Sequence, residues 1–267
     1  MKISLVIPVK NLWKEYTQPC LTSILNSRIP SEMNFDILII DNGSTDETKD
    51  AINFIAQKQL PMIKYYRNEE NLGCSRTWNF GIRRSIKNGS DLVFIINNDI
   101  LLHQNCIAHL YNRLKDSADN VVMATAMDIR GECIIPEDVL SKRDLDKEGL
   151  GESDSPNFAA FMLNKKLIEN VGEFDEGFFP AYFEDNDMHY RIKLAGVRAI
   201  CKPMALFYHF VSRTQLQVPG GLIDSNQFSA NRDYYVSKWG GVPGSERFTT
   251  PFNDPNLSIK WTKQSSQ

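Results

Sequence analysis

Short apolar runs alternate with helical patterns through the first half of the chain, and this alternation constrains the fold more than any other feature of the sequence. The apolar runs at 3–9, 35–40, 63–66 and 92–96 are too short for helices and are typical of strands buried on both faces. Segments with apolar residues at helical spacing follow the first three runs. Alternating strands and helices predict a doubly wound, Rossmann-like α/β fold with a mostly parallel central sheet flanked by helices.

The second half of the chain is less regular, and no obvious linker divides it from the first half. A helix at 104–115 and a strand-like segment at 121–126 complete the first half. The elements expected in the second half are apolar or strand-like segments at 158–163 and 197–201 and helices at 165–171, 184–195 and within 224–239. Residues 127–156 are polar and charged, and we expect a loop there with at most one hairpin. We therefore expect a single domain over residues 1–241, followed by a C-terminal tail at 242–267.

Composition and charge exclude several classes of protein. Apolar residues make up 42% of the chain, too many for a disordered protein, and no apolar run approaches the about 20 residues that a membrane-spanning helix needs. The first run ends at Pro8 and is too short for a signal peptide. The five cysteines form no CxxC pair, which favours free thiols in a reducing compartment, and the net charge of -3 argues against a nucleic-acid partner. We expect a cytoplasmic protein without a transmembrane segment.

Asp41 and Asp99 each follow a predicted strand directly, and doubly wound sheets bind ligands beyond the carboxyl ends of their strands. Ser44 and Glu47 have the spacing of a capping box for the next helix. Because Ser44 and Asp46 already serve the start of that helix, Asp41 is left partly free for a ligand. Its carboxylate has two possible roles. It could accept a hydrogen bond from a ribose hydroxyl or a base N–H of a ligand, or it could cap the next helix. The chain lacks the GxGxxG and P-loop motifs, which argues against a dinucleotide dehydrogenase or a P-loop kinase.

The tripeptide Asn97-Asn98-Asp99 has two interpretations. Mg²⁺ and Mn²⁺ prefer oxygen ligands and often take only one or two carboxylates together with substrate phosphates, and Asp99 supplies the one full charge here. Asn and Asp are also common in turns at strand ends, and for the tripeptide in isolation this second interpretation is the better one.

Three carboxylates lie within four residues in the segment Glu184-Asp185-Asn186-Asp187, at the start of a predicted helix. Acidic groups at this position oppose the positive end of the helix dipole, so the cluster fits a well-capped helix. It also fits a general base for a hydroxyl, with a pKa that the helix N-terminus lowers so that the base stays ionised. The aromatic residues between Phe178 and Phe183 suit either a surface that stacks on a sugar or the core.

Three further side chains are candidates for ligand binding. His209 stands between two aromatic residues, as structural histidines often do, and imidazole is also a ligand of Mn²⁺. Arg76 follows the loop that ends at Gly73, and Arg213 lies four residues after His209. Each arginine suits either a phosphate or acceptor partner or an exposed surface position.

Taken in order, these segments closely resemble the family 2 glycosyltransferases of GT-A fold. The resemblance is carried by Val6-Ile7-Pro8-Val9, Asp41 to Asp46, Asn71-Leu72-Gly73, Asn97-Asn98-Asp99, Glu184-Asp185, Arg191 to Gly196, and Lys238-Trp239-Gly240-Gly241. It implies that a sugar is transferred with inversion from a nucleotide diphosphate-sugar to the hydroxyl of a saccharide or another acceptor, assisted by Mn²⁺ or Mg²⁺. It also implies a nucleotide-binding half at 1–126 and an acceptor-side half at 127–241.

The resemblance assigns roles to individual residues. The residues that it implies for donor binding are Pro8, Val9, Asp41, Asn71, Gly73, Arg76, Asn97 and Asn98. Asp185 would be the catalytic base with Glu184 beside it, and Asp99 would hold the metal, with His209 as a late metal ligand. Asn97 stands where the family's metal motif has an aspartate, which removes one negative charge from the expected site.

Other functions fit parts of the sequence. A two-carboxylate hydrolase accounts for the acidic cluster but for neither Asp41 nor Asp99. A nucleotidyltransferase on a related sheet needs a Gly-rich, basic phosphate loop near the first strand, which is not visible in the sequence. A non-catalytic module that binds a nucleotide or a glycan is compatible with the uncharged Asn97.

Overall fold

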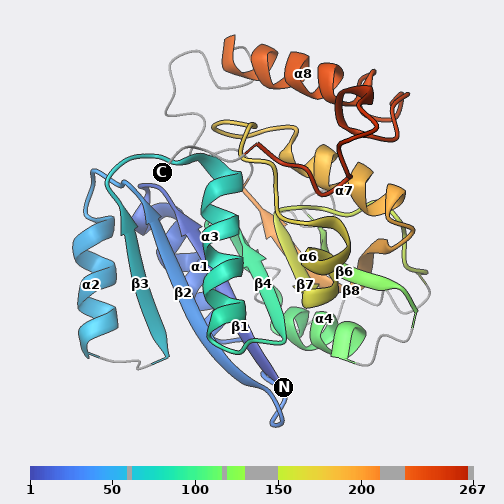
Figure 1. Ribbon diagram of the computed structural model, residues 1–267. Coiled ribbons are helices and arrows are strands. Elements are labelled where there is room, and N and C mark those ends of the chain that lie inside the picture. The colour runs from blue at the N-terminus through green and yellow to red at the C-terminus, as the bar shows by residue number, and fades with distance from the viewer. Residues whose placement is uncertain (59–61, 116–118, 130–149, 211–225, 264–267) are drawn as a thin grey trace.

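The structure is a computed structural model that describes residues 1–58, 62–115, 119–129, 150–210 and 226–263 (Figure 1). Within these residues eight strands form one sheet in the order β3-β2-β1-β4-β7-β6-β8-β5. The strands are β1 Lys2–Val9, β2 Asn34–Asn42, β3 Ile63–Asn68, β4 Leu92–Ile96, β5 Ile100–Leu102, β6 Val121–Asp128, β7 Ala160–Asn164 and β8 Arg198–His209. The α-helices are α1 Gln18–Leu25, α2 Thr48–Lys58, α3 Gly73–Lys87, α4 Cys106–Lys115, α6 Lys165–Val171, α7 Glu184–Leu194 and α8 Asn226–Trp239.

The first half of the sheet is parallel, as the sequence predicts. β1 pairs in parallel with both β2 and β4, and β2 pairs in parallel with β3. Because successive side chains of a strand point to opposite faces, Leu5 and Ile7 pack with α1 and α4 while Val6 packs with α3 on the other face. Helices therefore cover the sheet on both sides, and the carboxyl ends of β1, β2 and β4 are left at one edge (Figure 1).

The second half of the sheet changes direction. β7 is antiparallel to β4 and to β6, and β8 runs parallel to β6 before its last residues pair antiparallel with β5. The strand expected at 197–201 is thus the beginning of a longer strand that ends at His209. β5 was not expected from the sequence, because three residues carry too little periodicity to identify a strand. The hairpin considered within 127–156 falls largely on residues 130–149, which lie outside the described residues, as does Arg213.

The predicted capping role of Ser44 is wrong, whereas that of Asp46 is confirmed. The hydroxyl of Ser44 accepts a hydrogen bond from the backbone N–H of Asn11 at 2.8 Å, and Asp46 accepts the N–H of Thr48 at the start of α2 at 3.0 Å. The contact between Ser44 and the distant Asn11 is one that local spacing does not reveal.

Within the described part of the chain, no helix has both the length and the apolar character needed to cross a membrane. The four cysteines described, at positions 20, 74, 106 and 201, are free thiols, as expected.

Gly81 fixes how closely α3 approaches β1. A Cβ added there would lie 2.4 Å from Cγ1 of Val6 and 3.1 Å from Cδ1 of Ile40. We expect Gly81→Ala to lower the free energy of unfolding, because overpacking costs about 1–3 kcal/mol and outweighs the about 1 kcal/mol that alanine gains in helix propensity. Urea unfolding measures the change. The control Gly151→Ala meets no atom within 4 Å and should change stability by less than about 0.5 kcal/mol; equal stability of both variants would contradict the prediction.

Candidate active site

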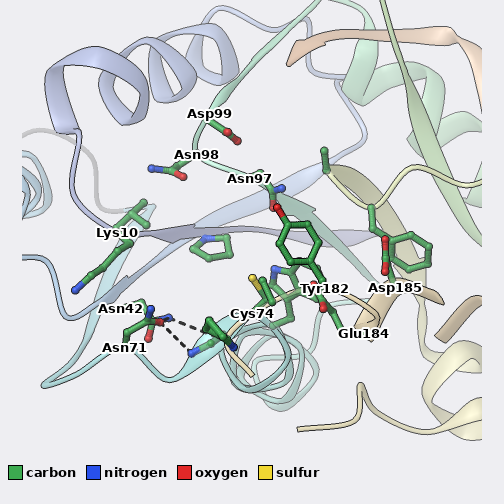
Figure 2. A pocket seen from close by; sticks show the side chains of 18 of the residues that line it. Lys10, Asn42, Asn71, Cys74, Asn97, Asn98, Asp99, Tyr182, Glu184 and Asp185 are labelled. Atoms are coloured by element: carbon green, nitrogen blue, oxygen red, sulfur yellow. Dashed lines mark hydrogen bonds between the residues drawn. The ribbon is translucent and has the colours of Figure 1, made fainter. Parts of the chain in front are cut away.

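A pocket of about 350 Å³ opens where the strand ends meet the start of α7 (Figure 2). Its walls come from the ends of β1, β2 and β4, the start of α3, the residues before β7, the loop that leads into α7, and the end of β8. Ten of the twelve residues predicted for the site line it, namely Pro8, Val9, Asn71, Gly73, Asn97, Asn98, Asp99, Glu184, Asp185 and His209. The fold therefore brings together strand-end and helix-start groups that lie far apart in the sequence.

The strand ends form one wall of the pocket. Asn97, Asn98 and Asp99 follow β4 directly, beside the end of β1, because the two strands run in parallel. The side chain of Asn98 donates a hydrogen bond to the hydroxyl of Thr17 at 2.9 Å, and it is almost fully buried. Asn98 therefore also fixes the turn after β4, as the strand-end interpretation of this tripeptide requires.

Asp99 and His209 meet because β5 pairs with β8. Ile100 lies opposite His209 in this antiparallel pair, and the N–H of Phe210 donates to the carbonyl of Asp99 at 3.0 Å. Nε2 of His209 lies 3.3 Å from Oδ1 of Asp99, and Oδ2 of Asp128 lies 4.0 Å from Nδ1. A carboxylate of this kind behind an imidazole is a common arrangement in metal sites.

The donor atoms of Asp99 and His209, a carboxylate oxygen and an imidazole nitrogen, are of the kinds that bind divalent cations. One carboxylate oxygen and one imidazole nitrogen face the same pocket at a separation that a shared ion allows. No group of three or more His, Cys, Asp or Glu side chains with metal-ligand geometry occurs within the described ranges. The described residues therefore supply two donors here, and a bound ion would need further ligands, such as substrate phosphates or water.

Glu184 and Asp185 form the opposite wall, in the first turn of α7. The N–H of Asn186 donates to Oδ1 of Asp185 at 2.8 Å, whereas Oε2 of the buried Glu184 has no hydrogen-bond partner in the described part of the protein. Burial raises the pKa of both carboxyl groups, and the charge of Asp185 raises that of Glu184 further. The expected lowering of the pKa by the helix N-terminus is thus wrong, because the loss of solvation exceeds the effect of the backbone N–H groups.

Asp41 and Arg76 are not among the residues that line the pocket. Asp41 is fully buried: its Oδ1 accepts the N–H of Ser44 at 2.7 Å, and its Oδ2 accepts the hydroxyl of Tyr65 at 2.8 Å and pairs with Arg67. Burial and the hydrogen bond to Asp41 raise the pKa of Tyr65 to about 12. The prediction that Asp41 is partly free for a ligand is therefore wrong in this structure, since both of its oxygens are engaged.

Several residues that line the pocket were not predicted from the sequence, chiefly Lys10, Asn42, Cys74, Trp78 and Asn157 to Ala159. Lys10 follows β1 and Asn42 ends β2, so the strand-end rule that selected Asp99 applies to both. Asn42 donates to the side chain of Asn71 at 2.7 Å and accepts the N–H of Leu72 at 2.9 Å, which holds the loop before α3. The residues before β7 reach this edge only because β7 is antiparallel to β4, a direction that the sequence does not reveal.

Known proteins share both sequence and fold with this chain. The sequence model described as Glycosyl transferase family 2 matches residues 4–162, more than half of the chain. The abequosyltransferase RfbV of Salmonella typhimurium is 37% identical over 119 residues, which are 45% of this chain and 34% of RfbV. The chain spans half or less of the length of this and other curated glycosyltransferases that it matches.

Two solved structures share the fold. A mannosyltransferase from Pyrobaculum calidifontis, PcManGT, in complex with GDP-Man and Mn²⁺, superposes with a TM-score of 0.60 and 18% identity, over 79% of this chain and 57% of that one. GalNAc-T7 with UDP, GalNAc and Mn²⁺ superposes with a TM-score of 0.65 and 14% identity, over 89% of this chain and 48% of that one. The fold is that of the GT-A glycosyltransferases, as the sequence predicts.

The burial of Glu184 makes stability depend on pH. Because its pKa is raised in the folded state, the folded protein binds more protons than the unfolded one between the two pKa values, and stability falls as pH rises through that window. We expect Glu184→Gln to raise the free energy of unfolding at pH 7 by about 1 kcal/mol or more, since one pKa unit corresponds to about 1.4 kcal/mol.

Urea unfolding of this variant at pH 7 and at acid pH measures the effect. The gain should shrink at acid pH, where the wild-type side chain becomes protonated and loses its charge. The control Glu15→Gln changes an exposed glutamate and should leave stability unchanged at both pH values. If Glu184→Gln instead lowered the free energy of unfolding at pH 7, burial of the Glu184 carboxylate would not destabilise the folded protein, and the prediction would be contradicted.

Proposed function

Because the chain belongs to glycosyl transferase family 2, we propose that it transfers a glycosyl group from a nucleoside diphosphate-sugar to an acceptor hydroxyl, with inversion at the anomeric carbon. The observation that carries this proposal is that Asp99 and Asp185 line one pocket (Figure 2), which His209 also lines, beside Asp99. The GDP-Man and Mn²⁺ bound to PcManGT and the abequosyltransferase activity named for RfbV support the reaction class.

The donor nucleotide would occupy the wall made by the ends of β1 and β2. Pro8 and Val9 offer apolar surface to the nucleoside, while Asn71 and the backbone at Gly73 offer polar groups that Asn42 holds in place. Lys10 also lines this wall, and its ammonium group, which donates to the carbonyl of Gly43, would suit a phosphate as a further partner. Asp41 would contribute indirectly, since its bonds to Ser44 and Arg67 fix the loop after β2.

Asp99 and His209 would hold a divalent cation, with Asn97 and Asn98 beside them. When bound, the cation would stabilise the negative charge that the departing diphosphate gains. Asn97 provides an amide in place of a carboxylate, so the protein adds less negative charge to the space that an anionic diphosphate must enter.

Asp185 would act as the general base from the opposite wall. Its carboxylate would accept the proton of the acceptor hydroxyl while the oxygen bonds to the anomeric carbon and the bond to the diphosphate breaks. Attack from the face opposite the leaving group inverts that carbon. Burial raises the pKa of Asp185, which makes it a stronger base than an exposed aspartate.

We place the protein in the cytoplasm. The four free thiols of the described residues support a reducing compartment. The donors proposed here are soluble, charged molecules that such a compartment can supply.

The variant Asp185→Asn tests the base. It keeps the shape of the side chain but cannot accept the proton, so we expect turnover to fall by about 10²–10⁴-fold. Turnover is measured with a panel of UDP-, GDP-, CDP- and dTDP-sugars, Mn²⁺, and mono- and disaccharide acceptors. The dissociation constant of the matching nucleoside diphosphate should stay within about twofold of the wild-type value, a much smaller change than a tenfold loss, which corresponds to about 1.4 kcal/mol.

The control for this test is Asp50→Asn, an exposed position on α2 that should behave like the wild type. Full turnover by Asp185→Asn would remove Asp185 from the base role. Release of pyrophosphate from nucleoside triphosphates would instead support a nucleotidyltransferase, and tight diphosphate binding without turnover of any donor would support a binding module.

The variants Asp99→Asn and His209→Ala test the metal pair. Each removes one of the two donors that the described residues supply, and we expect the dissociation constant for Mn²⁺ in the presence of UDP or GDP to rise at least about tenfold, or 1.4 kcal/mol. Calorimetric titration of the nucleotide-bound protein measures this constant. An unchanged Mn²⁺ affinity in both variants, equal to that of Asp50→Asn, would exclude Asp99 and His209 as ligands.

A further inference from the structure

The loop that precedes α7 has an unfavourable backbone conformation. Tyr182 and Phe183 have φ angles of 78° and 72°, in the left-handed region that bulky side chains rarely adopt. Residues in this region cost of order 1–3 kcal/mol each and persist only where the surroundings hold them. Tyr182 lines the pocket and Phe183 is the N-cap residue directly before α7, so this conformation sets the direction in which the chain enters the helix at Glu184 and Asp185.

A single side chain of α8 holds this loop by its backbone. Asn231 is 2% exposed and accepts the N–H of Phe179 at 3.3 Å. Its amide nitrogen donates to the carbonyls of Ala181 at 2.9 Å and Tyr182 at 3.2 Å. One amide thus makes hydrogen bonds to three residues of the loop, using both its acceptor and its donors.

The same helix holds the far side of the loop and the first turn of α7. Phe228 of α8 packs against Tyr182 and Phe183, with ring centroids 5.3 Å and 5.2 Å apart. Lys238 and Trp239, at the end of α8, bind the buried carboxylate of Asp187 at 2.7 Å and 2.8 Å. Figure 1 shows α8 beside α7, outside the sheet. α8 therefore contacts the two residues before the acidic pair and the residue two positions after Asp185.

We propose that Asn231 is a positioning residue, which holds the Phe179–Phe183 loop so that Tyr182 and the start of α7 face the pocket. Asn231 does not line the pocket itself and acts through the loop backbone. Lys238 and Trp239, at the other end of α8, bind Asp187 and so attach the first turn of α7 to α8. These contacts give the Lys-Trp-Gly-Gly segment a structural role in the site. The effect on turnover rests on the proposed base role of Asp185, whereas the effect on the loop does not.

The test compares Asn231→Ala, Asn231→Asp and the control Gln227→Ala, an exposed amide on the same helix. The aspartate variant keeps the size and the acceptor of Asn231 but cannot donate to the two carbonyls while it is ionised. Hydrogen exchange followed by mass spectrometry should show faster exchange at residues 177–187 in both Asn231 variants, and unchanged exchange at residues 1–10 and 92–99.

Kinetics of the same variants provide the second readout. We expect kcat to fall at least about tenfold in both Asn231 variants, or 1.36 kcal/mol in activation free energy, with the dissociation constant of UDP or GDP within twofold of wild type. Gln227→Ala should match the wild type in every measurement. The aspartate variant keeps the proposal testable if the alanine variant does not fold.

The outcomes separate this proposal from the proposed function. Wild-type kcat and wild-type exchange in Asn231→Asp would overturn the positioning role and would mean that Asn231 only fills space. A parallel loss of nucleotide binding and kcat would also overturn it, because that pattern indicates general unfolding. Faster loop exchange in variants of a protein whose wild type turns over no donor would support the positioning role and overturn the proposed function.

Discussion

Three carboxylates, those of Asp99, Glu184 and Asp185, line one pocket, and the electrostatic free energy of holding them there is the constraint on which the rest of the site depends. A neighbouring thiol reports their combined effect: burial and then all three charges raise the pKa of Cys74. A cation at Asp99 and His209 would offset this negative charge, and an anionic diphosphate would in turn require that cation. The pocket thus suits a negatively charged ligand only when a cation binds together with it.

The scaffold treats neighbouring acidic groups of α7 in opposite ways. Asp187 is fully buried, yet the charges of Arg191 and Lys238 outweigh burial and lower its pKa. Asp185, two residues earlier, has no such cation beside it within the part of the chain that the structure describes, and burial raises its pKa. The charges around Asp187 thus favour its ionised form, which fixes the helix, whereas burial of Asp185 favours its protonated form. Such a division between neighbouring groups is typical of sites that carry out acid–base chemistry.

The fold of the first half of the chain was predictable because its signals are local, whereas the second half depends on contacts between distant segments. Apolar runs predicted β1, β2, β3 and β4, and the strand-end rule found Asp99. The same rule overestimated Asp41, because only the structure reveals Tyr65 and Arg67 around its carboxylate. The role of Asn231 was invisible, since an asparagine within a helix pattern carries no sign of the loop 50 residues away that it binds.

The course of β8 makes the Asp99–His209 pair sensitive to chain length. β8 pairs with β6 as far as Lys202 and resumes at Leu206 after an irregularity, and its last residues then pair with β5. Because neighbouring side chains of a strand point to opposite faces, inserting or deleting one residue between Leu206 and His209 would turn the imidazole to the other side of the sheet. The irregularity before Leu206 already absorbs extra residues without disturbing the pairing of Leu206 and Phe207 with β6. Insertions are thus tolerable at that bulge, while the short stretch after it must keep its length for the imidazole to reach Asp99.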